Sequence, residues 1–175
     1  MPAAPVPAPV TRPEIPETGD ERPMLTVWLD YQRATLLWKC EGLDGTALSR
    51  RGVPPSALSL LGIVRHMTFV EWSWFEKVFA GLSTPQPFPT DVDRDSDFND
   101  LHAERAVADV ERFHEQCDTS RSIVAGAESL DALAVASSYG TMSLRWILIH
   151  MIEEYARHNG HADLLREQID GAVGE

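Results

Sequence analysis

The sequence has little cysteine and no long apolar run. Its two cysteines, Cys40 and Cys117, form no CxxC motif and are expected to be free thiols, as in a reducing cytoplasm. No apolar segment approaches the ~20 residues that a membrane span needs. The opening MPAAPVPAPVTRPEIPE has neither the basic region nor the apolar region of a secretory signal. A cytoplasmic protein that does not cross a membrane is therefore expected.

Basic residues are also scarce. Lysine and arginine number 15 against 27 aspartates and glutamates, so the formal net charge is -12 with histidine neutral. A body this acidic repels nucleic-acid backbones and anionic membrane surfaces, and the sequence has no compensating basic stripe. The glycine-rich nucleotide motifs, HExxH and the serine-nucleophile motifs are absent as well. A small molecule is therefore the expected partner, bound by some other arrangement of residues.

Proline divides the chain into an arm and a body. More than half of the twelve prolines lie between Pro2 and Pro23, among small apolar residues, which favours a polyproline II or disordered arm over residues 1–23. Hydrophobic residues make up 43% of the 175 residues, so the remainder is long enough to fold without disulfides or metal. We expect one domain over residues 24–171, followed by a short tail over 172–175.

Apolar side chains recur at helical spacing in four segments, and no segment shows the alternation typical of a strand. The pattern predicts an all-α fold, an antiparallel four-helix bundle. The connection STPQPFPTDVDRDSD is predicted to be a functional loop or lid, within a crossover between the second and third helices. The predicted helices cover 24–41, 59–80, 100–126 and 142–169, with Ser56 or Ser59 capping the second and Asp97 or Asn99 the third.

The last helix carries four ionisable side chains on one side. At about 100° per residue, His150, Glu154, His158 and His161 fall within an arc of about 80°, which they share with core-facing residues such as Ile147. A single histidine there would most simply be a hydrogen-bonded core residue. Burying all four without partners would be costly, so a metal ion or a mutual hydrogen-bond network is expected.

Two of these residues have the spacing of metal ligands. Glu154 and His158 are one helical turn apart and could converge on one ion, which would need a further ligand from another helix. His66 is the natural choice, because it lies in the strongly apolar second helix, whereas His102 and His114 lie among charged residues. A core histidine bonded to a backbone carbonyl is the alternative interpretation of His66.

Several further side chains have candidate roles. His161 is a candidate catalytic residue, which could act as a general base, hold a metal ligand in place or contact the substrate. His150 is predicted either to contact a metal ligand or to lie in the core. Arg33 and Glu71 could pair across helices. Three tryptophans are predicted to lie in the core, with the wall of a pocket as the alternative: Trp72, Trp74 and Trp146.

Four segments follow one another in the order and spacing of a known family: WLDYQRATLLWKCEGL, PSALSLLGIVRHM, HMTFVEWSWFEKVFAG and SLRWILIHMIEEYARHNGHADLLRE. Over residues 22–171 the chain resembles the DinB/YfiT-like superfamily of metalloenzymes, and its actinobacterial subgroup in particular. The resemblance implies a four-helix bundle with an open divalent-metal site, whose ligands here are His66, Glu154 and His158. Glu154 stands where many members have histidine, but the related mycothiol-dependent maleylpyruvate isomerases use a His/Glu/His set. Zinc is the expected metal, and this set of ligands is also compatible with nickel, iron or manganese.

The resemblance also implies a chemistry. Relatives are often isomerases or S-transferases that act with mycothiol, bacillithiol or glutathione, so a low-molecular-weight thiol is the expected co-substrate. A site of three ligands leaves a position for that thiol, whose pKa the metal lowers, or for a water that supports hydrolysis. Three interpretations stand: a thiol-dependent transferase or isomerase, a metal-dependent hydrolase, and a non-catalytic bundle whose metal site is structural or vestigial and which works as a homodimer or ligand-binding module.

Overall fold

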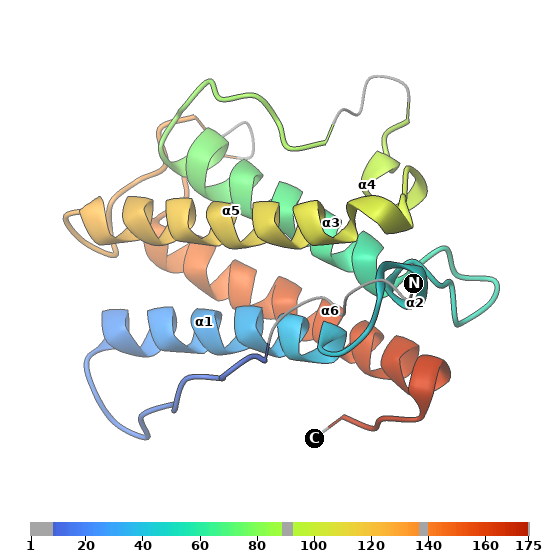
Figure 1. The fold of residues 1–175 in the computed structure, drawn as a ribbon. Helices are drawn as coiled ribbons and strands as arrows, with labels where there is room; N and C mark the ends of the chain where they lie inside the picture. Colours follow the sequence, from blue (N-terminus) through green and yellow to red (C-terminus); the bar gives the residue numbers. More distant parts are fainter. Residues whose placement is uncertain (1–8, 89–92, 137–139, 175) are drawn as a thin grey trace.

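Four long helices form the body of the protein in the computed structural model, which describes residues 9–88, 93–136 and 140–174 (Figure 1). The described residues contain no β-strand, so the predicted all-α class is confirmed. No helix among them is both long enough and apolar enough to cross a membrane. The long helices are α1 (Glu21–Cys40), α3 (Leu60–Glu71) with its π-helical continuation η1 (Trp72–Phe79), α5 (Ala106–Gly126) and α6 (Leu144–Asp170). The short ones are α2 (Gly45–Leu48), α4 (Ser96–Asn99) and η2 (Ala103–Arg105).

The first and third long helices begin at residues other than those predicted. α1 starts at Glu21 rather than at 24, because Pro23 falls in the first turn, where a backbone N–H is not needed. α5 starts at Ala106 rather than at 100, and no side chain caps it. The short elements α4 and η2 occupy the residues ahead of it. Asp97 is therefore not the predicted cap of the third helix and has a different contact, described below.

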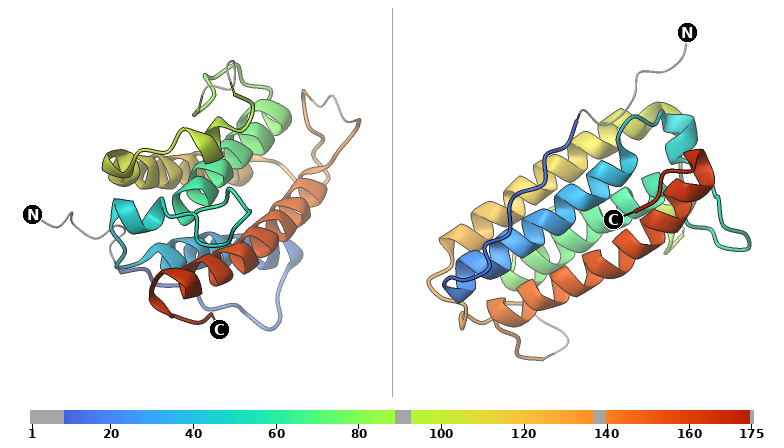
Figure 2. Two further views of the ribbon diagram at one scale, coloured as in Figure 1. Left: turned by 90° about the vertical axis from the view of Figure 1, so that its right-hand side faces the viewer. Right: turned by 90° about the horizontal axis from the view of Figure 1, so that it is seen from below.

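The long helices pair as parallel neighbours. α1 and α6 run in the same direction, since Arg145 near the start of α6 pairs with Glu21, and Asn159 farther along donates to Gln32. α3 and α5 also share a direction, opposite to that of the first pair (Figure 1, Figure 2). Because α5 begins at the end of the bundle where α3 begins, the connection between them returns along the length of the bundle. This connection is the predicted crossover, and it carries α4.

Serine caps and one glycine set the ends of the helices. Ser59 and Ser143 each accept a hydrogen bond from the backbone N–H three residues on, which fixes the starts of α3 and α6. Gly171 ends α6 with a φ of 80°, a left-handed conformation that glycine adopts without strain. The space between the helices is filled mainly by large apolar side chains: Leu36, Leu61, Ile63, Met67, Phe75, Phe113, Ile147 and Met151.

A buried ion pair joins α1, α3 and α6. Arg33 donates from Nε and Nη2 to the two carboxylate oxygens of Glu71, at 2.8 and 2.7 Å, as the sequence suggested. Tyr155 donates its hydroxyl to Glu71 at 2.8 Å, and burial raises the pKa of this hydroxyl well above its usual range. All three side chains are buried. Because Tyr155 directly follows Glu154, this network fixes α3 against α6 close to the predicted ligands.

Residues 9–20 of the predicted arm lie along α1 without forming a helix or a strand, whereas its last three residues belong to α1 itself (Figure 2). Arg12 donates to the Tyr31 hydroxyl at 3.0 Å, and its guanidinium lies 4.5 Å from the centre of the Trp38 ring. These contacts attach the arm to the outer side of α1. The prediction for residues 1–8 of the arm falls outside the described residues, as does Glu175 of the predicted tail.

Candidate metal centre

Three side chains from two helices converge where α3 packs against α6. Nε2 of His66 lies 3.8 Å from Oε1 of Glu154, and the same oxygen lies 3.6 Å from Nε2 of His158. One potential ligand atom from each residue lies within 4.8 Å of the other two. The structure thus brings together all three residues that the sequence analysis proposed as ligands.

The His66 ring is held by a residue that the sequence analysis did not assign to the site. Oδ2 of Asp97, in α4, lies 2.8 Å from Nδ1 of His66. A carboxylate at this distance accepts the Nδ1 proton and leaves the Nε2 lone pair directed at Glu154 and His158. Phe98 also stacks on the His66 ring, with ring centres 4.8 Å apart. The sequence pointed to Asp97 only as one of several aspartates in the connection between the second and third helices. No local pattern reveals that this connection returns along the bundle to His66.

Arg65 anchors α4 in this position. Its guanidinium donates to the backbone carbonyls of Asp97 and Ser96, at 3.1 and 3.2 Å, and to the Asp109 carboxylate at 3.0 Å. Arg65 is buried, so these charge-assisted bonds form in a region of low dielectric. Arg65 directly precedes His66 in α3. One turn of helix therefore supplies both the candidate ligand His66 and the side chain that anchors Asp97, which contacts it.

Replacing Asp97 with asparagine is expected to weaken zinc binding about 10- to 100-fold. The amide keeps the size of the side chain, but it removes the charge that fixes the His66 proton on Nδ1. Competition with a chromophoric chelator measures the affinity. Asp100→Asn is the matched control, because Asp100 lies 3.0 Å from Nε2 of His102 in a pair outside the group. Equal affinities for the two variants would show that Asp97 does not support the ligand.

Burial determines the protonation of His158. Burial, and then the neighbouring His66 ring, lower the pKa of His158 to about 4, so the ring is neutral at pH 7. Neutral imidazole is the form that binds metal ions. The buried Nδ1 of His158 has no hydrogen-bond partner among the described residues, so the ring makes its polar contact on the Nε2 side, which faces Glu154.

The converging residues fit a divalent ion. Ligand atoms about 2.1 Å from a tetrahedral zinc ion lie about 3.4 Å from one another, close to the 3.6 and 3.8 Å found here. Two imidazoles and one carboxylate are a donor set used by zinc and by divalent iron. His66 and Glu154 are only half-buried, and no fourth histidine, cysteine or acidic residue joins the group within the described ranges. Such a site keeps a coordination position for solvent or a small molecule.

The remaining histidines lie outside the group. His161, the candidate catalytic residue, packs edge-on against His158, with ring centres 5.3 Å apart. His150, one turn before Glu154 in α6, stacks on the ring of Trp146. Both are thus neighbours of the three converging residues rather than members of the group. Two further histidines also do not join it: His102 and His114.

The three tryptophans do not share one environment. Trp72 is buried and donates its indole N–H to Thr84 at 2.9 Å, in agreement with the predicted core position. Trp74 is half-buried. For Trp146 the core prediction is wrong, because its side chain is 46% exposed. It lies at the outer edge of the α3–α6 contact, where its ring packs on His150 and Trp74.

Both cysteines are expected to be unreactive in the native protein. Cys40 and Cys117 are buried, and burial raises the pKa of Cys40 to about 12 and that of Cys117 further above its usual range. Titration with a disulfide reagent at pH 8 should therefore detect no thiol before denaturation and two after it. Rapid reaction of either thiol in the folded protein would contradict this, and would provide a nucleophile within the chain.

Comparison with known proteins identifies the family of this chain. No curated protein and no solved structure matches the chain. The mycothiol-S-transferase family model matches residues 24–171. This range includes His66, Asp97, Glu154 and His158, and it covers most of the chain. The protein therefore belongs to the mycothiol-S-transferase family.

Proposed function

We propose that this protein is a metal-dependent transferase that activates a low-molecular-weight thiol, with mycothiol as the first candidate, and joins it to an electrophilic small molecule. The observation that carries the proposal is the convergence of His66, Glu154 and His158 at one half-buried point, in a chain of a thiol-transferase family. These residues would hold a divalent ion, which would supply a Lewis acid that lowers the pKa of a bound thiol. Zinc suits the donor set, and nickel, iron and manganese are the alternatives for metal analysis.

The side chains of the group have separate tasks in this proposal. His66 and His158 would hold the ion, and the Asp97 carboxylate at Nδ1 of His66 fixes the tautomer that this requires. Arg157 donates to Oε2 of Glu154 at 3.2 Å, which leaves Oε1 facing the two imidazoles. His161 restricts rotation of the His158 ring by packing against it. Its role is therefore to position a ligand.

Two observations bear on the choice between a catalytic and a structural site and on the source of the thiol. A purely structural zinc site is closed by four protein ligands, whereas the described residues offer three. The nucleophilic sulfur must come from outside the chain, since both cysteines are buried. Hydrolysis would use the same coordination position for water, so a requirement for added thiol separates the two chemistries.

The test measures conjugation of a thiol to chlorodinitrobenzene by the zinc-loaded protein. Mycothiol, glutathione and cysteine are compared at equal concentration, before and after removal of zinc by a chelator. We expect acceleration that is largest with mycothiol, is lost on chelation and returns with added zinc. No acceleration above the uncatalysed rate with any of these thiols would refute the proposal. Equal rates with and without metal would refute the role of the ion.

A further inference from the structure

Three aromatic rings lie beside the metal centre. His150 is one turn from Glu154 on α6, a displacement of about 6 Å along the helix axis. The His150 ring stacks on Trp146, with ring centres 5.1 Å apart and an angle of 19° between the planes. Trp74, from η1, contacts both rings, at 4.7 Å from His150 and 5.6 Å from Trp146. We call these three residues the aromatic platform.

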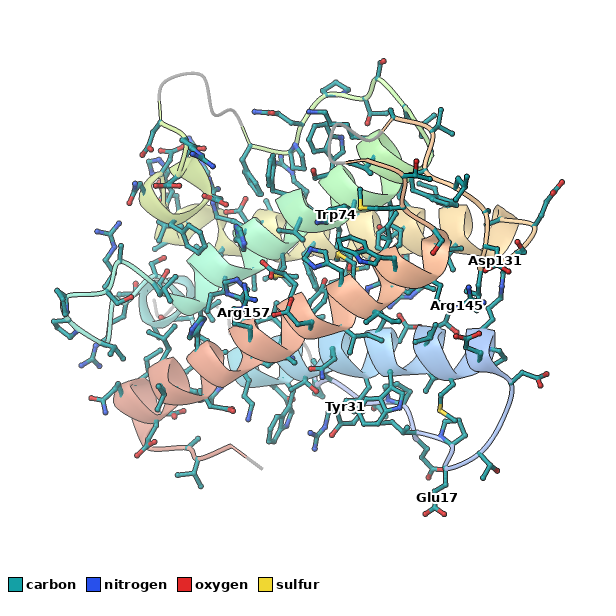
Figure 3. The ribbon with its side chains drawn as sticks, turned by 180° about the vertical axis from the view of Figure 1, so that it is seen from behind. Glu17, Tyr31, Trp74, Asp131, Arg145 and Arg157 are labelled. Carbon is teal, nitrogen blue, oxygen red and sulfur yellow. The ribbon has the colours of Figure 1, made fainter. Side chains whose placement is uncertain are left out.

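One member of the platform, Trp146, is open to solvent, whereas Trp74 and His150 are half-buried. Trp146 is 46% exposed, and the neighbouring Ile149 is 52% exposed. Figure 3 shows Trp74 between the ribbons of η1 and α6, with Arg157 farther along α6 on the same side of the molecule. Adjacent exposed apolar side chains beside a cluster of polar ligands are typical of a binding surface.

The helix that presents Trp74 is unusual. η1 is π-helical, and at its end the Ala80 N–H bonds to the Phe75 carbonyl five residues back. π-Helical turns occur mostly as short insertions, frequently at functional sites. Within η1, Trp72 turns its indole inward to Thr84, whereas Trp74 faces α6. Two residues only two positions apart in η1 therefore have different roles: Trp72 belongs to the buried part of the helix, and Trp74 belongs to the platform.

The charges next to the platform disfavour an anionic ligand. Oε2 of Glu153 lies 3.7 Å from Nδ1 of His150, and Glu154 is one turn beyond His150. The guanidinium of Arg157 binds both of these carboxylates, so its positive charge is compensated. Indole faces bind flat apolar groups by stacking. An uncharged, planar molecule therefore matches both the shape and the charge of this surface.

We propose that the aromatic platform binds the electrophilic substrate, and that this substrate is an uncharged molecule with an aromatic or other planar apolar part. The inference rests on the proposed function of the adjacent metal centre. With chlorodinitrobenzene, the thiolate sulfur forms a bond to the ring carbon that carries chlorine, the carbon–chlorine bond breaks, and chloride leaves. The proton of the thiol passes to solvent. Stacking on Trp146 and Trp74 holds the ring while this exchange takes place.

Binding is tested first, without any thiol. Dinitrobenzene is planar, uncharged and unreactive, and its binding to the zinc-loaded protein is followed through the indole N–H signals in a two-dimensional NMR spectrum. We expect the signals of Trp74 and Trp146 to move, and Trp146→Ala to weaken binding about 5- to 10-fold. Trp28→Ala is the matched control, since Trp28 is 38% exposed on α1 and packs on Tyr31. Equal weakening by both variants, or movement of the Trp28 signal alone, would overturn the inference.

Turnover is tested second, as the ratio of kcat/KM for chlorodinitrobenzene to that for iodoacetamide, an electrophile without a ring. Trp146→Ala should lower this ratio about 5- to 10-fold, mainly through KM, and Trp28→Ala should not change it. A ratio that stays at the wild-type value would overturn the inference, as would a wild-type dimer that Trp146→Ala converts to a monomer in sedimentation. Failure of transfer with both electrophiles would refute the proposed function. The inference about the platform would then still be decided by the binding of dinitrobenzene, which requires no transfer.

Discussion

His66→Ala is expected to weaken zinc binding by more than about 100-fold, beyond the loss caused by changing a residue that only orients a ligand. The reason is geometric, because the variant leaves the two proposed ligands of α6, Glu154 and His158, without one from α3. Calorimetric titration of the metal-free protein with zinc measures the effect. The same variant should lose the thiol conjugation described above.

Helical content should change little in this variant. His66 is half-buried, and the apolar residues of α3 that fill the core are untouched. Circular dichroism checks this point. His102→Ala serves as the control, since His102 also lies beside carboxylates but takes no part in the group. An affinity for zinc within about threefold of the wild-type value would mean that the three residues are a buried polar network and not a metal site.

Glu71→Ala is expected to lower the free energy of unfolding by about 3–5 kcal/mol, a large part of the about 5–15 kcal/mol typical of a domain. The substitution leaves the buried guanidinium of Arg33 with Asp30 as its acidic neighbour, and it removes the acceptor of the Tyr155 hydroxyl. Urea denaturation followed by circular dichroism at constant protein concentration measures the loss.

Two further variants define the cause. Glu21→Ala removes an exposed ion pair with Arg145, labelled in Figure 3, and should cost less than about 1 kcal/mol. The triple variant Arg33→Met, Glu71→Leu, Tyr155→Phe removes every member of the buried network at similar volume, and it should recover most of the stability. If Glu71→Ala and Glu21→Ala cost the same, the buried pair does not carry the stability assigned to it.

The parts of the site that could be predicted are those set by one helix. The four-residue spacing of Glu154 and His158 places both on one side of α6, whatever the rest of the fold does. His66 could be added because a histidine within so apolar a helix must face other helices. The sequence analysis also named Arg33 and Glu71 as residues that could pair across helices, and the structure contains this pair.

The parts that could not be predicted depend on the path of the chain between helices. Asp97 meets His66 because the connection from α3 returns along the bundle, and helical periodicity contains no information about that path. The shared direction of α1 and α6 has the same origin. Trp146 was misplaced for another reason: it lies about 100° from Ile147 around α6, at the edge of the apolar side, where its ring packs on Trp74 and still stays 46% exposed.

The pairing of α1 with α6 has a consequence for synthesis on the ribosome. α1 packs more extensively against α6 than against any other helix, and their ion pair joins Glu21 to Arg145, which are 124 residues apart. The apolar side of α1 therefore emerges long before the helix that covers it is made, and closing so long a loop is slow. The proposed ligands follow the same order, because His66 leaves the ribosome well ahead of Glu154 and His158. Nascent chains should consequently need protection by chaperones, and zinc should be captured only after α6 has been released.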